Sequence, residues 1–159
     1  MKKTFTLLLA FLISFLPACA AGNGETTSTE KQGAGNMKIQ IAIKNDSGNH
    51  TLTATLADNS SATAFYELLK KDSLTVKLNE YGGFEKVGSL GTSLPRNDRQ
   101  VKTSAGDIML YQGNQITIFY NGNSWNFTRL GKIDGTTQAE LKKILGKGNV
   151  TAVFSVQRL

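Results

Sequence analysis

Cysteine and histidine are almost absent from this sequence, and their scarcity limits its chemistry. Among 159 residues, Cys19 is the single cysteine and His50 the single histidine. One cysteine excludes a disulfide within the chain, and the two residues together cannot form a Cys/His zinc site. One histidine leaves one candidate base for a catalytic triad, and no GxSxG sequence accompanies it. We therefore predict no metal site and no cofactor.

The N-terminus has the layout of an export signal. Lys2 and Lys3 precede a mostly apolar stretch at residues 4–16, which is shorter than the roughly 20 residues that span a membrane. The sequence Leu16-Pro17-Ala18-Cys19 follows, and it resembles the lipobox of bacterial lipoproteins. This resemblance implies that residues 1–18 are a signal peptide and that Cys19 carries acyl chains such as palmitate. The alternative is a secreted protein with an unrelated cysteine near its cleavage site.

The segment that follows Cys19 predicts a flexible tether. Residues 20–36 are rich in Gly, Ala, Thr and polar groups and contain no large apolar side chain. A glycine-rich chain of this length has an r.m.s. span of about 20–25 Å. We expect a folded domain at residues 37–159, held close to a lipid bilayer in the cell envelope, outside the cytoplasm.

The charge balance argues against a nucleic-acid partner. The whole chain has a formal net charge of +6, with 18 basic and 12 acidic residues. Loss of Lys2 and Lys3 with the leader lowers this net charge to about +4, which could favour an anionic membrane surface. No dense Lys/Arg cluster with interleaved aromatic residues is present, nor a GxGxxG or GK[ST] phosphate loop.

Alternating apolar residues predict a domain made mainly of β-strands. Residues 58–61, Asp-Asn-Ser-Ser, offer N-caps for an amphipathic helix at about 60–71, and Thr137 with Glu140 fits a capping box for a second helix at about 137–146. The strands are expected at residues 39–43, 52–56, 74–78, 84–87, 107–111, 116–120, 125–129 and 150–156. Consecutive hairpins favour an antiparallel sheet, which we expect to close into an eight-stranded barrel with the two helices capping its ends. Residues 88–106 are expected to form a long loop, which is often functional.

Several stretches resemble the bacterial cyclophilin-like domain family. They are residues 106–111, 116–120 and 125–133, together with 81–86 and 94–95, and the similarity covers residues 37–156. The resemblance implies an eight-stranded barrel with two capping helices, which agrees with the strand pattern. It does not imply a reaction, since the family is mostly uncharacterised.

True cyclophilins are prolyl isomerases, and the comparison with them is made residue by residue. Their active strand carries Phe-His-Arg-Val, where this chain has Phe84-Glu85-Lys86-Val87. Lys86 would take the arginine role, but an ammonium group is a poor substitute for a planar guanidinium fork. The cyclophilin Gln-Gly-Gly-Asp sequence is not evident, and Leu130-Gly131-Lys132-Ile133 resembles a segment that is mainly structural.

Aromatic and basic residues suggest a binding groove. Trp125 and Arg129 are expected to face one side of their strand, and the loop at 88–106 is expected to border the same groove. An aromatic floor with a basic edge would suit an extended peptide or an acidic ligand. The candidate binding residues are Tyr81, Phe84, Arg96, Tyr111, Trp125 and Arg129. The alternative is that Trp125 belongs to the barrel core.

Three carboxylates, Glu80, Glu85 and Asp107, are candidates for a catalytic pair, although a solvated rim is the simpler interpretation. Two function classes therefore remain. The first is a membrane-anchored, non-catalytic module that binds a peptide or small ligand, and the second is a divergent envelope prolyl isomerase with Lys86 at its centre. The sequence leaves the oligomeric state open.

We predict that Cys19→Ser releases the protein from membranes, because the thiol is the only group of the lipobox that can carry the anchor. Phase partitioning in detergent should move the variant into the aqueous phase, while Thr26→Ser in the tether should leave it in the detergent phase. Unchanged membrane partitioning of the Cys19 variant would contradict the lipoprotein interpretation.

Overall fold

The computed structural model describes residues 37–46 and 48–157. The predicted signal peptide, Cys19 and the tether lie outside the described residues. The described part has nine strands and two helices: β1 (Lys38–Asn45), β2 (Gly48–Leu56), α1 (Ser60–Lys71), β3 (Leu74–Tyr81), β4 (Glu85–Ser89), β5 (Arg99–Lys102), β6 (Asp107–Tyr111), β7 (Gln115–Phe119), β8 (Ser124–Ile133), α2 (Gln138–Leu145) and β9 (Val150–Val156).

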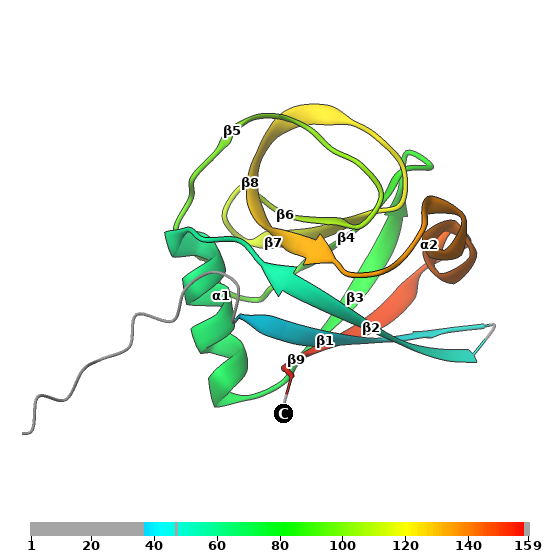
Figure 1. Cartoon of the computed structure of the whole chain (residues 1–159), viewed down its shortest axis with the longest axis horizontal. Helices are drawn as coiled ribbons and strands as arrows, with labels where there is room; N and C mark the ends of the chain where they lie inside the picture. The colour runs from blue at the N-terminus through cyan, green and yellow to red at the C-terminus, as the bar shows by residue number, and fades with distance from the viewer. Residues whose placement is uncertain (1–36, 47, 158–159) are drawn as a thin grey trace, which may run out of the picture. The chain divides into compact units, whose positions relative to one another are not determined.

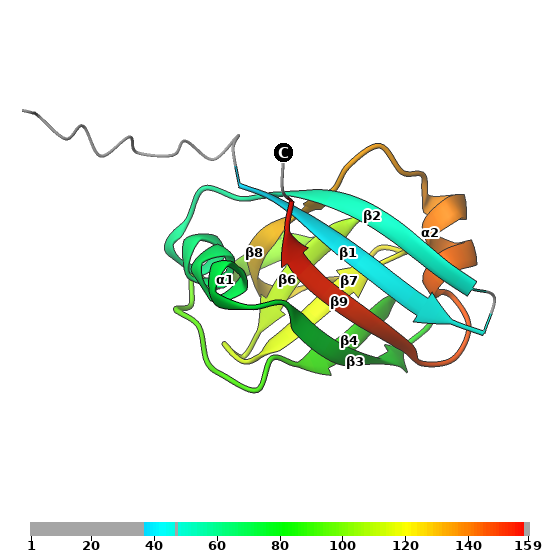
Figure 2. The ribbon, with the colours of Figure 1, turned by 90° about the horizontal axis from the view of Figure 1, so that it is seen from below.

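Eight of the nine strands close into an antiparallel barrel. Their order is β2-β1-β9-β3-β4-β7-β6-β8, and β8 pairs back onto β2. The closing contact sets Ala54, Thr55 and Leu56 opposite Ile133, Lys132 and Gly131. Figure 2 shows β2, β1, β9 and β3 side by side in front, with the other half of the barrel behind them. The prediction of a closed, mainly antiparallel barrel is confirmed, and closure leaves these strands without a free edge.

Apolar side chains from alternate strand positions fill the barrel interior. Ile39, Ile41 and Ile43 of β1 point inward and are buried. α1 adds Phe65, whose ring meets that of Phe154 edge to face with centroids 5.8 Å apart. Further members of this core come from six other strands: Ala54, Leu56, Val76, Leu78, Ile108, Leu110, Ile116, Ile118, Leu130, Ile133 and Ala152.

The two helices begin where their caps predict. The Asn59 side chain accepts a hydrogen bond from the Ala62 backbone N–H at 2.9 Å, and Thr137 and Glu140 form the expected capping box. The sequence favours Gly146 at the C′ position, just beyond the second helix, but it is the C-cap of α2 and has a right-handed backbone conformation. Figures 1 and 2 show α1 and α2 on opposite sides of the barrel. Neither helix of the described part is long and apolar enough to cross a membrane.

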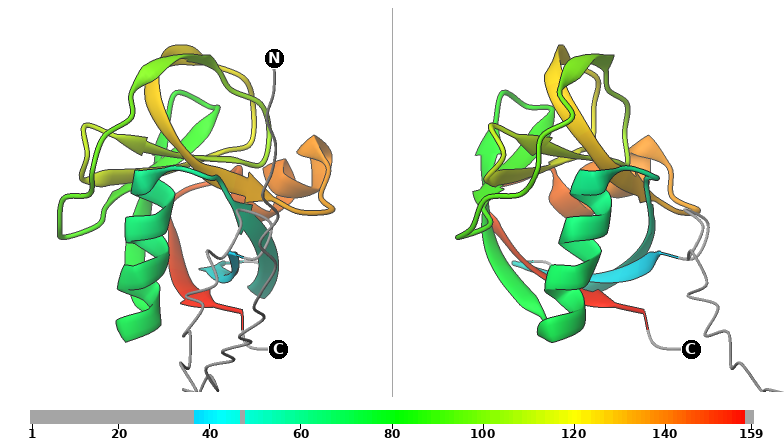
Figure 3. Two further views of the ribbon diagram at one scale, coloured as in Figure 1. Left: turned by 60° about the vertical axis from the view of Figure 1, so that its left-hand side comes forward. Right: turned by 90° about the vertical axis from the view of Figure 1, so that its left-hand side faces the viewer.

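The loop expected at residues 88–106 was only partly a loop, and this changes the architecture. It contains a ninth strand, β5, which pairs with the first half of β8 through Arg99–Lys102 opposite Ser124–Phe127. β5 and this half of β8 form a two-stranded ribbon that arches away from the helices, as Figures 1 and 3 show. The sequence pattern missed β5 because its four residues, RQVK, include a single apolar side chain.

The ribbon forms a second, smaller hydrophobic cluster outside the barrel. Met109 of β6, Phe119 of β7 and Phe127 of β8 are buried against one another there. Val101 of the ribbon packs on the same cluster. The outer face of β6 and β7 is therefore covered and not exposed to water. Because both faces of these strands are covered, their sequences are mostly apolar and do not alternate with polar residues.

We predict that Gly131→Ala destabilises the barrel by about 1–3 kcal/mol, because a side chain there would overpack the seam between β8 and β2. An added Cβ would lie 2.6 Å from the Thr55 carbonyl oxygen and 3.0 Å from the Leu56 Cα atom. Gly122→Ala is the matched control, since the nearest atom to its Cβ is 3.4 Å away. Equal thermal midpoints for the two variants would contradict the closed seam.

Candidate functional site

A pocket of about 450 Å³ lies on the outer wall of the barrel, beside the ribbon. Strands β4, β6 and β7 contribute residues from their outward faces, and the first half of β8 contributes Trp125 and Phe127. The volume falls in the range of about 300–1,000 Å³ that is usual for small-ligand sites. The lining residues are Tyr81, Phe84, Glu85, Val87, Tyr111, Gln115, Thr117, Asn123, Trp125 and Phe127.

Four of the six binding residues proposed from the sequence line this pocket. They are Tyr81, Phe84, Tyr111 and Trp125. Tyr81 and Trp125 are 58% and 57% exposed, although both are large apolar side chains. The alternative that Trp125 belongs to the barrel core is therefore wrong. Exposed aromatic side chains beside a cavity are typical of binding surfaces.

The aromatic walls rest on the second hydrophobic cluster. Phe84 stacks on Phe119 with centroids 6.4 Å apart, and Phe119 meets Phe127 edge to face at 5.4 Å. Tyr111 meets Phe127 edge to face at 5.8 Å, and Tyr81 meets Phe84 in the same way at 5.9 Å. These contacts link the walls of the pocket to buried side chains, so the pocket is pre-formed rather than assembled by a ligand.

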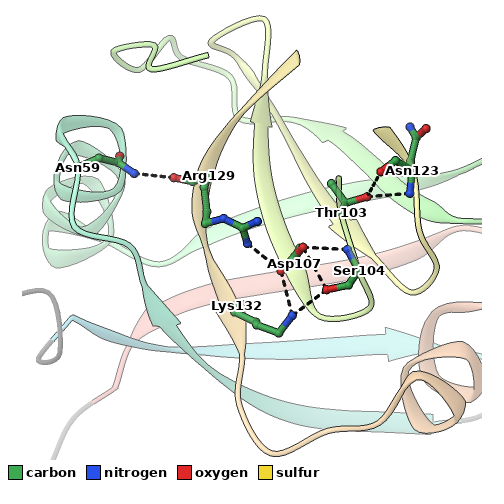
Figure 4. A network of polar contacts seen from close by, with 7 residues as sticks. All are labelled: Asn59, Thr103, Ser104, Asp107, Asn123, Arg129 and Lys132. Atoms are coloured by element: carbon green, nitrogen blue, oxygen red, sulfur yellow. Dashed lines mark hydrogen bonds and ion pairs between the residues drawn. The ribbon is translucent and has the colours of Figure 1, made fainter. Parts of the chain in front are cut away.

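Arg129 is not among the residues that line the pocket with Trp125. Its guanidinium group donates to Asp107 Oδ1 at 2.8 Å, as Figure 4 shows. β8 exchanges β5 for β6 as its partner after Phe127, so Arg129 lies opposite Met109 of β6, in the part of β8 that belongs to the barrel. Arg129 lines a separate, smaller cavity of about 230 Å³ with Arg99.

Arg96 also lies away from the pocket. Its guanidinium group binds Asp98, whose carboxylate also accepts a hydrogen bond from the Thr128 hydroxyl at 2.6 Å. Burial works to raise the pKa of Asp98, but the hydrogen bonds from Thr128 and Arg96 outweigh it and lower the pKa. The basic edge that the sequence suggested is therefore not part of the aromatic pocket.

Lys86, the residue aligned with the cyclophilin arginine, points into the barrel. It is fully buried, and its ammonium group binds Glu80 and donates to the Gly148 carbonyl at 2.5 Å. Tyr120 donates to the same Glu80 carboxylate at 2.5 Å. Burial works to raise the pKa of Glu80, but the hydrogen bonds from Lys86 and Tyr120 lower it overall. Lys86 thus stabilises the interior and is absent from the pocket lining.

The Asp107 carboxylate accepts several hydrogen bonds, and it lies outside the pocket. Besides Arg129, it accepts from Lys132 Nζ at 3.1 Å and from the Ser104 backbone N–H at 2.9 Å, as Figure 4 shows. Burial works to raise the pKa of Asp107, but these donors lower it overall. The same close view shows Thr103 bonded to Asn123, which fixes the turn beside the pocket.

Glu85 is the one charged residue among those lining the pocket. It is 6% exposed, and its Oε2 atom has no hydrogen-bond partner within the described part of the chain. Burial raises the pKa of Glu85 to about 7. Thr117, 1% exposed on the neighbouring strand, likewise has an unpartnered hydroxyl group. Glu85 and Asp107 are thus buried and not part of a solvated rim, whereas the Glu80 side chain is 30% exposed and pairs with Lys86.

The polar floor of the pocket was not evident from the sequence. Val87 and Thr117 face each other across β4 and β7, on the same side of the sheet as Glu85. Alternation along β4 could have placed Glu85 and Val87 on one face. It could not show that this outer face is covered, because the cover depends on β5. No group of three or more His, Cys, Asp or Glu side chains suited to a metal ion occurs within residues 37–46 and 48–157.

Comparison with known proteins gives a family match and a structural similarity. A model described as the Cyclophilin-like family matches residues 46–155. The solution structure of a hypothetical protein from Archaeoglobus fulgidus is similar in fold, with a TM-score of 0.57 and 14% identity over 80% of this chain and 99% of that chain. At this identity the likeness shows the fold alone. No curated protein sequence matches the chain.

We predict that Glu85→Gln stabilises the fold above about pH 7, by about 1–3 kcal/mol. Because the pKa of Glu85 rises from 4.5 to about 7 on folding, its contribution to stability is fully present below 4.5 and is lost as the pH rises through about 7. The glutamine removes this loss without changing the shape of the side chain.

Thermal unfolding of both proteins across this pH range measures the effect. The difference in unfolding midpoint between Glu85→Gln and the unchanged protein should grow from pH 4.5 to about pH 7 and stay constant above that range. Glu67→Gln, on the exposed face of α1, should show no such gap, because Glu67 is 54% exposed. A pH-independent difference for Glu85→Gln would contradict the assignment.

Proposed function

The chain belongs to the cyclophilin-like family, and from this premise we propose that it is a membrane-anchored, non-catalytic module that binds a peptide or small ligand. The observation that carries the proposal is the pocket on the outer barrel wall. It combines exposed aromatic walls with two buried, unpartnered polar atoms on its floor. Buried polar groups without partners cost stability, and they are usually retained where a ligand satisfies them.

The N-terminal sequence supports the anchored part of the proposal. Cys19 would carry the acyl chains, and residues 20–36 would tether the barrel to the membrane of the cell envelope. In this arrangement the helices α1 and α2 cap the barrel ends, which leaves the side-wall pocket as the binding surface. Phe65 and Leu69 of α1 and Leu141 and Leu145 of α2 are buried in the main core, which favours such a role.

The position of Lys86 favours binding over isomerisation. A prolyl isomerase of the cyclophilin type needs a cationic donor beside the peptide bond that rotates. Lys86 is buried against Glu80 and lies over the Tyr120 ring, with its Nζ atom 5.6 Å from the ring centre. To reach the pocket it would have to leave this ion pair, which is costly for a buried charge. A peptide would therefore bind without any acceleration of the cis/trans isomerisation of its prolyl bond.

The test uses one capped tripeptide, Phe-Pro-Lys, which offers an aromatic ring, a proline and an amine. NMR titration should shift the resonances of Tyr111 and Trp125, and exchange spectroscopy should show the uncatalysed rate of prolyl isomerisation. Shifts confined to residues outside the pocket would contradict the proposed site, and accelerated prolyl exchange would support the isomerase alternative.

We predict that Trp125→Ala weakens peptide binding about tenfold or more, which corresponds to a loss of about 1.4 kcal/mol. The fold should survive, because Trp125 is more than half exposed and leaves no core cavity. Arg96→Ala is the control for a residue outside the pocket, and its binding should match that of the unchanged protein. Titration of each variant with the same tripeptide measures this, and equal losses in both would contradict the pocket.

A further inference from the structure

The charge of the pocket differs from the charge of the whole protein. The chain is basic overall, with a formal net charge of +6. Among the ten residues that line the pocket, however, Glu85 carries the only charge. The basic residues that the sequence suggested for the site form ion pairs outside the pocket: Lys86 with Glu80, Arg96 with Asp98, and Arg129 with Asp107. The carboxylate of Glu85 therefore has no counter-charge within its own pocket.

Two polar atoms on the floor of the pocket also favour a positively charged ligand. Glu85 Oε2 can accept a hydrogen bond and Thr117 Oγ1 can accept one as well, and neither has a partner in the part of the chain that is described. Glu85 lies opposite Phe119 and Thr117 lies opposite Val87, so the two polar groups come from adjacent strands on one face of the sheet. A group with several N–H donors would satisfy both at once.

The walls of the pocket suit a cation with an apolar body. Tyr81, Phe84, Tyr111, Trp125 and Phe127 place five aromatic side chains around the cavity. The face of an aromatic ring attracts a cation, and the attraction grows when water is excluded. The same rings bury hydrocarbon surface. A carboxylate surrounded by aromatic rings therefore discriminates against anions and favours an organic ammonium ion.

We propose that the pocket binds an organic ammonium group, which contacts Glu85 and Thr117 while its apolar body lies against the aromatic walls. This inference rests on the proposed binding function and names the chemical class of the ligand. The cation could belong to a free alkyl or arylalkyl amine or to the lysine side chain of a peptide. Both sources offer the same ammonium chemistry, and the experiment below separates them.

Binding should strengthen as the pH rises, because an ionised carboxylate attracts the cation more strongly than a neutral one. With its pKa raised to about 7, Glu85 ionises within the range that is easily tested. The titratable groups that face it are the phenols of Tyr81 on β3 and Tyr111 on β6. The sides of β7 and of the β8 ribbon that line the pocket present Gln115, Thr117, Trp125 and Phe127, which carry no charge. Lys86, Glu80 and Tyr120 lie behind the sheet, on the interior side.

The experiment compares three probes of one shape: 2-phenylethylamine, 2-phenylethanol and 3-phenylpropionate. The chain has one tryptophan, Trp125, so its fluorescence reports occupancy of the pocket directly. At about pH 8.5 we expect the amine to bind about tenfold or more tightly than the alcohol, and the carboxylate to bind more weakly than either. At about pH 5.5 the preference for the amine should fall to about twofold or less, because Glu85 is then protonated.

Glu85→Gln separates this inference from the proposed function. The variant keeps the shape of the pocket and should still bind the alcohol, but its preference for the amine should disappear at both pH values. Glu67→Gln, which removes a charge from the exposed face of α1, should keep the full preference. If the alcohol binds the unchanged protein as tightly as the amine does, the ammonium inference is wrong while ligand binding stands. If none of the probes alters Trp125 fluorescence, both are wrong.

A capped Gly-Lys-Gly peptide then identifies the source of the cation. Tighter binding of this peptide than of 2-phenylethylamine assigns the pocket to a lysine side chain. Tighter binding of the free amine assigns it to a small molecule. Either result supports the ammonium chemistry, provided that Glu85→Gln weakens that binding, and binding that is unchanged by Glu85→Gln overturns it.

Discussion

The architecture depends on the division of β8 between two pairings. Its second half joins β6 and β2 and closes the barrel, while its first half leaves the barrel and pairs with β5. A strand that only closed the barrel would leave the outer face of β6 and β7 in water. Instead, Phe127 turns back onto Phe119 and Met109 and creates a second cluster outside the barrel. The pocket lies at the edge of that cluster, so its existence follows from the length and curvature of one strand.

The environments of three carboxylates explain how the pocket acquires its chemistry. Glu80 and Asp107 lie beside cations and hydrogen-bond donors, and these contacts stabilise their ionised forms. Glu85 is nearly as buried as Asp107, but its Oε2 atom has no hydrogen-bond partner among the described residues, and burial alone raises its pKa. A protein gains no stability from an isolated carboxylate of this kind. Its cost is consistent with a group that is kept for binding, which is where natural proteins depart from the rules of stable folding.

The pocket and the position of Lys86 also differ from what the comparison with true cyclophilins implied. In β4 the side chains alternate, so Glu85 faces the pocket and Lys86 faces the interior. The position that corresponds to a catalytic arginine therefore holds a cation with a structural task. The surface beside it carries an acid. The opposite orientations of these two adjacent residues support the proposal that the pocket binds a cation and does not polarise a peptide carbonyl.

The sequence by itself determined the two helices, eight of the nine strands and the hairpins β1–β2, β3–β4 and β6–β7, because these follow from local periodicity, turns and caps. Alternation in β1 and β9, the Asn59 cap and the capping box at Thr137 each require only a few neighbouring residues. The same patterns identified Tyr81, Phe84, Tyr111 and Trp125 as candidate binding residues. Only the tertiary structure decided which charges stand beside them. In the folded protein Arg96 pairs with Asp98, Arg129 with Asp107 and the inward-pointing Lys86 with Glu80, while Glu85 Oε2 has no hydrogen-bond partner among the described residues. Local periodicity does not reveal these pairings, because ion pairing depends on distances that the three-dimensional placement of strands and loops sets.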